Sequence, residues 1–416
     1  MFKSVRGTKD ILPADTSAWQ EIENTARRVF SCYGFDEIRT PIIEESALFN
    51  RSLGSSTEII QKQMFLIQRD SDSFALRPEA TACVVRAYIE NDLDKKSGFS
   101  KFYYIGPMFR AERPQKGRLR QFHHLGVEAI GSVSPYLDIE IISLAGYLLQ
   151  EIGIAGFKIK INSLGCAEDK KNLAVSLRFK LKDNLDKLCE DCRERFKNNV
   201  FRILDCKNES CHAVVESLGL QNDHLCNDCK EHFLKVKSGL DATGVNYEVV
   251  PCLVRGLDYY TRTVFEITHA GLGSQDALGA GGRYDNLVSE LGGPQLGAMG
   301  FALGEERLLL ARPQGARAAT GSPVFVVTLG ETAKQEAVLL LDNLRKCGIR
   351  CDTDYEDKSL KAQMRQANNL NASFVLIIGD DELKKRVVVI KDMKTGAQEE
   401  VASDKITEVV KERIKC

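Results

Sequence analysis

The segment KFYYIGPMFRAERPQKGRLRQFHHLGVEAIG, from Lys101 to Gly131, decides how the rest of the sequence is interpreted. Its two ends, Lys101–Arg110 and Gln121–Gly131, are rich in the aromatic and branched side chains that favour strands, and the loop Ala111–Arg120 lies between them. The pattern predicts an antiparallel hairpin. A loop of this length in a compact hairpin is more often functional than idle.

Positive charge is concentrated in this loop. The segment Arg110–Arg120 carries four arginines and one lysine against the single acid Glu112. Guanidinium groups suit phosphate oxygens because two parallel N–H donors match two acceptors. A solvated basic loop is the plainer alternative.

The strand after the loop has an unusual face. Phe122, His124, Gly126 and Glu128 share it, because successive side chains of a strand point to opposite sides. A core face would be apolar, whereas a ring, an imidazole, a gap and a carboxylate suit the floor of a ligand pocket. An ordinary half-exposed sheet is equally compatible with these residues alone.

Length and composition limit the possible classes of protein. The chain has 416 residues, which suggests two or three domains, and its 43% hydrophobic and 28% charged residues are typical of a globular protein. The net charge of −1 excludes a general basic field for nucleic acid. No apolar run approaches the roughly 18–20 residues of a membrane span. The N-terminus lacks the apolar stretch of a secretory signal, so a cytoplasmic location is expected.

The order of elements predicts two domains. A helix is expected from Ser17 to Tyr33, with a capping box at Ser17 and a stop at Gly34. Residues 166–245 are helical and charged, and they suggest an insertion in a domain that spans residues 1–320. After a linker of small residues at 312–322, alternating strands and helices predict a small α/β domain over residues 323–416, with a partly parallel sheet.

Three other segments place arginines close to acids, as the hairpin does. They are LRPEAT at Leu76–Thr81, VRGLDYYTR at Val254–Arg262 and GFALGEER at Gly300–Arg307. Each alone has a structural explanation as a capped helix, a turn or a helix surface. The sequence has no GxxxxGK[ST] loop, no complete GxGxxG and no HExxH, so any phosphate would have to be bound by dispersed arginines.

These residues resemble those of a known family. FRAERPQKGRLRQF at Phe109–Phe122 is similar to the second motif of class II aminoacyl-tRNA synthetases, GFALGEERLLL at Gly300–Leu310 to the third, and DEIRTPIIE ending at Glu44 to the first. LVRGLDYYTRTVFE at Leu253–Glu266 and AGGRYD at Ala280–Asp285 resemble the two segments peculiar to histidyl-tRNA synthetases. Their presence in this order makes the resemblance specific.

The resemblance implies a fold and a reaction. The fold would be α+β, with an antiparallel sheet of six or seven strands flanked by helices, a helical insertion and a C-terminal α/β anticodon-binding domain. The enzyme would join L-histidine to the histidine tRNA through a histidyl-adenylate, using ATP and Mg²⁺. A homodimer is implied, with the first motif at the interface, and no membrane partner.

The resemblance also implies roles for individual residues. Arg110 and Arg255 are expected to hold the carboxylate and the α-phosphate from opposite sides as catalytic residues. His124 is a departure, because family members commonly carry glutamine there. ATP is expected to contact Arg110, Glu112, Arg118, Phe122, Arg255 and Arg307, and histidine to contact Glu79, Thr81, His124, Glu128, Tyr259, Tyr260 and Tyr284.

A non-catalytic relative is the alternative. The regulatory subunit of ATP phosphoribosyltransferase keeps the same fold as a histidine sensor, but it would be expected to lack the C-terminal domain and several of the motif arginines. This chain retains the segment after Pro323 together with Arg110, Arg255 and Arg307. The sequence therefore favours an active ligase.

Seven of the 13 cysteines lie between Cys166 and Cys229. The pairs Cys189-x2-Cys192 and Cys226-x2-Cys229 form a four-thiolate zinc pattern, and Cys206 and Cys211 lie between them. The 33 residues that separate the pairs exceed the usual spacing. Buried or free thiols are therefore the preferred interpretation, no metal ligand is predicted, and structural zinc remains the alternative.

Overall fold

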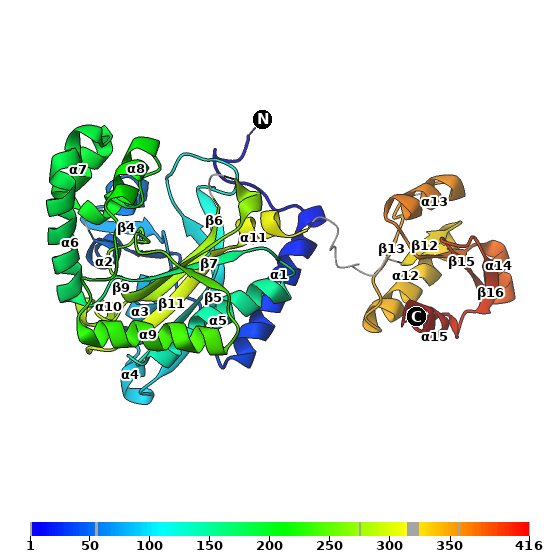
Figure 1. Cartoon of the computed structure of the whole chain (residues 1–416). Coiled ribbons are helices and arrows are strands. Elements are labelled where there is room, and N and C mark those ends of the chain that lie inside the picture. Colours follow the sequence, from blue (N-terminus) through cyan, green and yellow to red (C-terminus); the bar gives the residue numbers. More distant parts are fainter. Residues whose placement is uncertain (1, 55–56, 274–275, 314–323, 357, 416) are drawn as a thin grey trace. The chain divides into compact units, whose positions relative to one another are not determined.

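The computed structural model describes residues 2–54, 57–273, 276–313, 324–356 and 358–415 (Figure 1). The chain forms two units, Met1–Ala316 and Arg317–Cys416, each with its own core. Most of the linker expected at 312–322 lies outside the described residues. Within the described ranges, no helix is both long enough and apolar enough to cross a bilayer.

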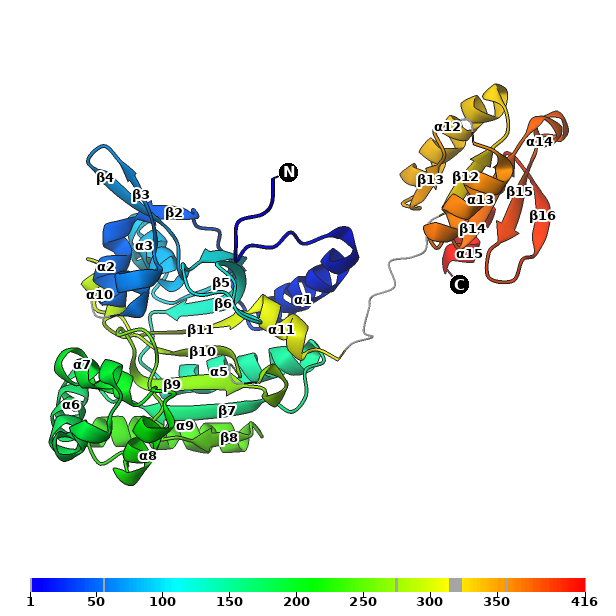
Figure 2. The same ribbon diagram turned by 90° about the horizontal axis from the view of Figure 1, so that it is seen from above.

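An eight-stranded sheet forms the centre of the larger unit (Figure 2). Its six middle strands are antiparallel, and the short edge strands β1 and β8 run parallel to their neighbours. The antiparallel sheet expected from the resemblance is thus confirmed, with edge strands that extend it. The order is β1 (Asp36–Glu37), β5 (Ser100–Phe109), β6 (Gln121–Ile130), β11 (Ala298–Gly304), β10 (Ala277–Arg283), β9 (Thr261–Thr268), β7 (Lys158–Ser163) and β8 (Tyr247–Val249).

One face of this sheet is covered by α1 (Pro13–Cys32), α5 (Pro135–Glu151) and α9 (Asn227–Ala242). Leu125, Val127 and Ala129 of β6 are fully buried in this layer, because they alternate with the polar face of the strand. The buried side chains of α1, among them Ile22, Val29 and Phe30, pack in the same layer. The core on this side leaves the opposite face of the sheet for the site.

Helices of the insertion and of the segment after β1 surround the opposite side. Between Cys166 and Val245 the structure is helical, as expected (Figure 1). A small sheet in the order β2-β4-β3 lies in the same half of the unit. The elements on this side are β2 (Ile43–Glu45), α2 (Ser46–Leu53), η1 (Ile59–Gln63), β3 (Phe65–Arg69), β4 (Asp72–Leu76), α3 (Thr81–Glu90), α4 (Leu93–Lys96), α6 (Ala167–Leu181), η2 (Lys182–Lys187), α7 (Glu190–Asn198), η3 (Val200–Ile203), α8 (Glu209–Ser217) and α10 (Leu287–Glu290). By contrast, η4 (Ala270–Leu272) and α11 (Glu305–Ala311) pack with the layer of α1 and α5.

The smaller unit is an α/β domain with a five-stranded sheet in the order β13-β12-β14-β15-β16. The first three strands are parallel and the last two antiparallel, which confirms the partly parallel sheet. α12 and α15 pack on one face, and α13 packs on the other. The elements are β12 (Val324–Thr328), α12 (Glu331–Lys346), β13 (Cys351–Thr353), α13 (Leu360–Asn369), β14 (Phe374–Ile378), α14 (Asp380–Lys385), β15 (Val387–Asp392), β16 (Gln398–Ala402) and α15 (Ile406–Lys415).

Candidate active site

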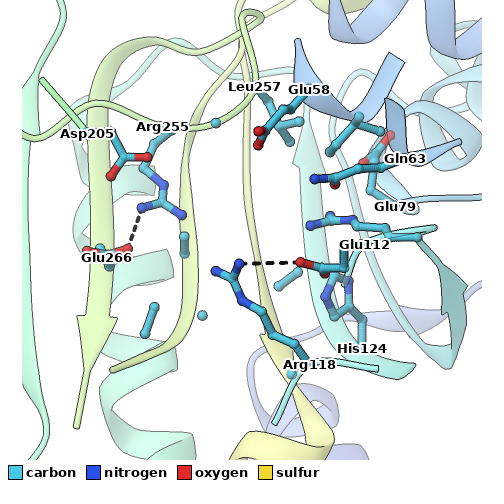
Figure 3. A pocket seen from close by; sticks show the side chains of 18 of the residues that line it. Glu58, Gln63, Glu79, Glu112, Arg118, His124, Asp205, Arg255, Leu257 and Glu266 are labelled. Atoms are coloured by element: carbon cyan, nitrogen blue, oxygen red, sulfur yellow. Dashed lines mark hydrogen bonds and ion pairs between the residues drawn. The ribbon is translucent and has the colours of Figure 1, made fainter. Parts of the chain in front are cut away.

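A cavity of about 790 Å³ lies on the polar face of β6 (Figure 3). Its walls come from β5, β6, β10 and β11, from the loop after β5, and from the insertion. Every residue that the sequence nominated for the site lines this one cavity. They are Glu79, Thr81, Arg110, Glu112, Arg118, Phe122, His124, Glu128, Arg255, Tyr259, Tyr260, Tyr284 and Arg307.

The hairpin of β5 and β6 builds the floor of the cavity. In its register Tyr104 is opposite Gly126, and a Cβ at Gly126 would lie 2.3 Å from the Tyr104 hydroxyl. The phenol of Tyr104 therefore occupies the gap that glycine leaves on this face. This places the Tyr104 hydroxyl beside Glu128, 3.4 Å from Oε1.

Glu128 is fully buried and accepts hydrogen bonds from three hydroxyl groups. The hydroxyl of Thr81 donates to Oε1 at 2.7 Å, that of Tyr104 donates to the same atom, and that of Tyr284 donates to Oε2. Burial is the largest cause that raises the pKa of Glu128 to about 8, although these donors act against it. Gly300 on β11 makes room for the carboxylate, because a Cβ there would lie 2.0 Å from Oε2.

Glu79 lies at the start of α3 and caps it. Its carboxylate accepts the backbone N–H groups of Thr81 at 2.7 Å and Ala82 at 3.0 Å. Burial raises its pKa, and these hydrogen bonds oppose the rise. Glu79 therefore caps a helix, as the plain structural explanation has it, and it also lines the cavity.

Three tyrosines form an aromatic wall next to these carboxylates. The ring centroid of Tyr259 is 4.7 Å from that of Tyr260 and 5.7 Å from that of Tyr284. Burial raises the pKa of all three phenols, so they remain hydrogen-bond donors at neutral pH.

His124 is a neutral group in this cavity. Burial, followed by the positive charges of Arg110 and Arg307, lowers its pKa to about 3. Its ring lies 5.0 Å from that of Phe122. Because the imidazole is uncharged, it does not repel a cationic substrate, which a protonated histidine in place of glutamine would do.

The four arginines nominated from the sequence come from three distant segments and are held by different partners. Figure 3 shows two of them, Arg118 and Arg255. Arg110 donates from Nε to the carbonyl of Pro78 at 2.9 Å, and its guanidinium lies 5.3 Å from the centroid of Phe122. Arg255 Nη1 is 2.6 Å from Glu266 Oε1. Arg118 pairs with Glu112 at 3.4 Å, and Arg307 donates from Nε to the carbonyl of Gly117 at 3.2 Å.

Several cavity residues were not singled out from the sequence. Tyr104 lies in the predicted strand, but its place opposite Gly126 depends on the register of the hairpin, which the long loop leaves open in the sequence. Glu266 lies at the end of a quoted motif, but its pairing with Arg255 depends on the turn between them. Arg202 and Asp205 reach the cavity from the insertion, and no sequence pattern indicated this.

Comparison with known proteins agrees with this geometry. Residues 7–308 match the family profile described as histidyl-tRNA synthetase, and residues 323–413 match an anticodon binding domain. The chain belongs to the histidyl-tRNA synthetase family. It is 45% identical to a histidine–tRNA ligase of Geobacter sulfurreducens over 96% of this chain and 97% of that protein.

Other family members give the same result. A histidine–tRNA ligase of Halothermothrix orenii is 46% identical, with 96% of each protein covered. Among solved structures, the apo histidyl-tRNA synthetase of S. aureus superimposes with a TM-score of 0.80 at 36% identity, covering 98% of this chain and 99% of that one. The family and the fold predicted from the sequence are thus confirmed over both units.

Proposed function

We propose that this chain joins L-histidine to the histidine tRNA in two steps. A carboxylate oxygen of histidine attacks the α-phosphorus of ATP, and pyrophosphate leaves. The terminal ribose hydroxyl of the tRNA then attacks the carbonyl carbon of the histidyl-adenylate, and AMP leaves. The observation that carries the proposal is the convergence of the dispersed arginines and the carboxylate-and-phenol pocket on one cavity.

The arginines would supply charge rather than covalent help. Transfer at phosphorus depends mainly on positioning and on neutralising the negative charge of the transition state. Arg110 and Arg255 would hold the α-phosphate and the carboxylate, whereas Arg118 and Arg307 would bind the outer phosphates. The Phe122 ring would stack on adenine, with Glu112 nearby.

Mg²⁺ is expected to arrive with ATP. This ion is usually held through substrate phosphates and one or two carboxylates. Glu112 and Asp276 both line the cavity, so its donor set fits the ion. The Mg²⁺ would add positive charge at the phosphates.

Recognition of histidine would rest on the buried polar groups around Glu128. Glu128, Tyr260 and Tyr284 are proposed to meet the imidazole, with Tyr259 and His124 beside them, while Glu79 and Thr81 would meet the amino group. A site with such groups rejects an amino acid that leaves them unpaired. The proposal therefore needs no editing domain.

The regulatory-subunit alternative is not favoured. Such a protein would be expected to lack the C-terminal domain and motif arginines, but residues 323–413 match an anticodon binding domain. Arg110, Arg255 and Arg307 all line the cavity.

Histidine-dependent exchange of pyrophosphate into ATP tests the proposal, together with transfer of labelled histidine to tRNA. Both reactions are expected. Tight histidine binding without exchange would instead support the sensor, and exchange with another amino acid would place the specificity elsewhere.

We also propose a homodimer in the cytoplasm. The small sheet next to the first motif exposes Ile43 and Leu66, at 51% and 59% of their surface, and large apolar side chains of this kind suit a protein interface. Light scattering on the full chain should give twice the mass of one chain. A location in the cytoplasm follows from the place of tRNA charging in protein synthesis.

A further inference from the structure

The cysteines of the insertion gather in two clusters, and the two CxxC pairs do not meet. Cys189 and Cys192 lie with Cys206 and Cys211, which we call the tetrad. The other pair, Cys226 and Cys229, lies with Cys166 and Asp169. The single site suggested by the sequence spacing is therefore wrong, because the partners of each pair come from other turns of the insertion.

The sulfurs of the tetrad have the separations of a tetrahedral site. All four Sγ atoms lie within 4.8 Å of one another, and Cys189 Sγ is 3.9 Å from Cys206 Sγ. Zinc with four thiolates has Zn–S distances of about 2.3 Å, which corresponds to S···S edges of roughly 3.8 Å. A contraction of less than about 1 Å would close the site around an ion.

Short elements carry the tetrad and orient it. Cys189 is the N-cap of α7 and Cys192 lies in that helix, Cys206 follows η3, and Cys211 lies in α8. Figures 1 and 2 show α7 and α8 close together. The backbone N–H of Cys189 points to Cys211 Sγ at 3.2 Å. Arg195 Nη1 is 3.9 Å from Cys192 Sγ.

Two neighbouring groups would stabilise thiolates on an ion. Four thiolates and Zn²⁺ carry a net charge of −2. An N–H donor and a guanidinium next to the sulfurs stabilise that charge, as groups around metal ligands commonly do. Cys192 and Cys211 are buried beside an apolar cluster, whereas Cys189 and Cys206 are partly exposed and line the cavity.

The second cluster has a structural explanation. Both oxygens of Asp169 are already used, because they accept the backbone N–H groups of Cys166 at 3.2 Å and Cys226 at 2.9 Å. The carboxylate thus caps α6 and joins it to the start of α9. Cys226 is also exposed. We assign no ion to this cluster.

We propose that the tetrad Cys189, Cys192, Cys206 and Cys211 binds one structural zinc ion. The ion would tie α7, η3 and α8 together, which have nine, four and nine residues and are too short to be stable alone. Binding would then be coupled to folding of this part of the insertion.

The position of the tetrad gives the ion a role in the active site. Arg202 and Asp205 line the cavity, and the negative charge of Asp205 acts on the guanidinium of Arg255. Figure 3 shows Asp205 beside Arg255. Because Cys206 directly follows Asp205, an ion on its sulfur would fix this wall of the cavity. The proposal concerns a structural ion and does not depend on the proposed ligase activity.

Metal analysis of the purified full-length chain tests the site. The parent should contain one zinc per chain at the tetrad, Cys206→Ser and Cys211→Ser should lose it, and the matched control Cys226→Ser should keep it. A parent without bound metal, a parent with iron instead of zinc, or a loss confined to Cys226→Ser would each overturn the proposal.

A second measurement decides the matter if the serine variants do not fold. The zinc of the parent is removed by a chelator and replaced with Co²⁺ alone, whose tetrahedral thiolate complexes absorb strongly in the visible and near-ultraviolet range. The expected spectrum is that of four thiolate ligands, and the metal-free chain should be cleaved faster by protease between residues 182 and 217. An octahedral Co²⁺ spectrum with unchanged cleavage would contradict the proposal.

Discussion

Glu128 accepts hydrogen bonds from three side chains of the cavity. Thr81, Tyr104 and Tyr284 all donate to it, and burial raises its pKa to about 8. Glu128→Gln keeps the size but turns an NH₂ group toward at least one of these donors. We expect the KM for histidine to rise by about tenfold or more, because leaving a buried donor or acceptor without its partner costs about 1–3 kcal/mol. Exchange kinetics would show this, and an equal rise in the KM for ATP would place Glu128 away from histidine.

Arg255 is held against Glu266, and in Figure 3 it lies beside Asp205 of the insertion. Arg255→Ala removes a guanidinium from the proposed α-phosphate site, so the rate of adenylate formation should fall more than tenfold. Arg255→Lys keeps the charge but loses the two parallel donors, and its rate should be intermediate. Circular dichroism should show an intact fold in both variants. An unchanged exchange rate in Arg255→Ala would remove this residue from the mechanism.

Glu305 is a buried carboxylate at the start of α11, and neither oxygen has a hydrogen-bond partner within the described ranges. Burial, followed by the charges of Glu23 and Glu306, raises its pKa to about 9 from 4.5. Between these two pH values the carboxyl group of Glu305 is ionised in the unfolded chain but protonated in the folded chain. The stability that Glu305 contributes is thus complete below pH 4.5 and is lost as the pH rises toward 9.

Glu305→Gln should remove this pH dependence. The variant is expected to gain stability relative to the parent as the pH is raised from 5 to 9, with a slope of at most about 1.4 kcal/mol per pH unit. Urea unfolding at several pH values measures it, and the exposed Glu331→Gln serves as the control. If the free energy of unfolding changed with pH in the same way in parent and variant, Glu305 would not be protonated in the folded chain.

At the scale of elements, the hairpin of β5 and β6 depends on a glycine. A Cβ at Gly126 would lie 2.3 Å from the Tyr104 ring, which can move only by withdrawing its hydroxyl from Glu128. Gly126→Ala should therefore raise the KM for histidine several-fold and lower the melting temperature, since overpacking costs about 1–3 kcal/mol. Gly98→Ala, where nothing lies within 4 Å, is the matched control. Equal effects of the two substitutions would refute the role of the gap.

Element boundaries show where sequence patterns succeed and fail. The stop at Gly34 was predicted correctly, because its φ of +76° lies in the region that glycine favours. The start at Ser17 was wrong, since α1 begins at Pro13. Proline suits a first turn, because the N–H groups there have no partner inside the helix.

At the scale of the whole molecule, the two units have separate cores and all the nominated site residues belong to the first. A chain shortened to residues 1–316 should keep histidine-dependent pyrophosphate exchange within a few-fold, while transfer of histidine to tRNA should fall more than tenfold. Arg255→Ala in the full chain is the control, because it should lose both reactions. Loss of exchange in a soluble, folded short chain would show that the second unit contributes to the cavity.

The sequence by itself determined the antiparallel hairpin, the polar face of β6, the α/β character of the second unit and the family, because these depend on patterns between near neighbours and on the order of motifs. It also nominated thirteen residues that share one cavity. Only the tertiary structure decided that Tyr104 fills the gap at Gly126, that Glu305 is buried without a partner, and that each CxxC pair has its own companions. These outcomes depend on distances between segments far apart in the chain, which are set by packing and not by spacing.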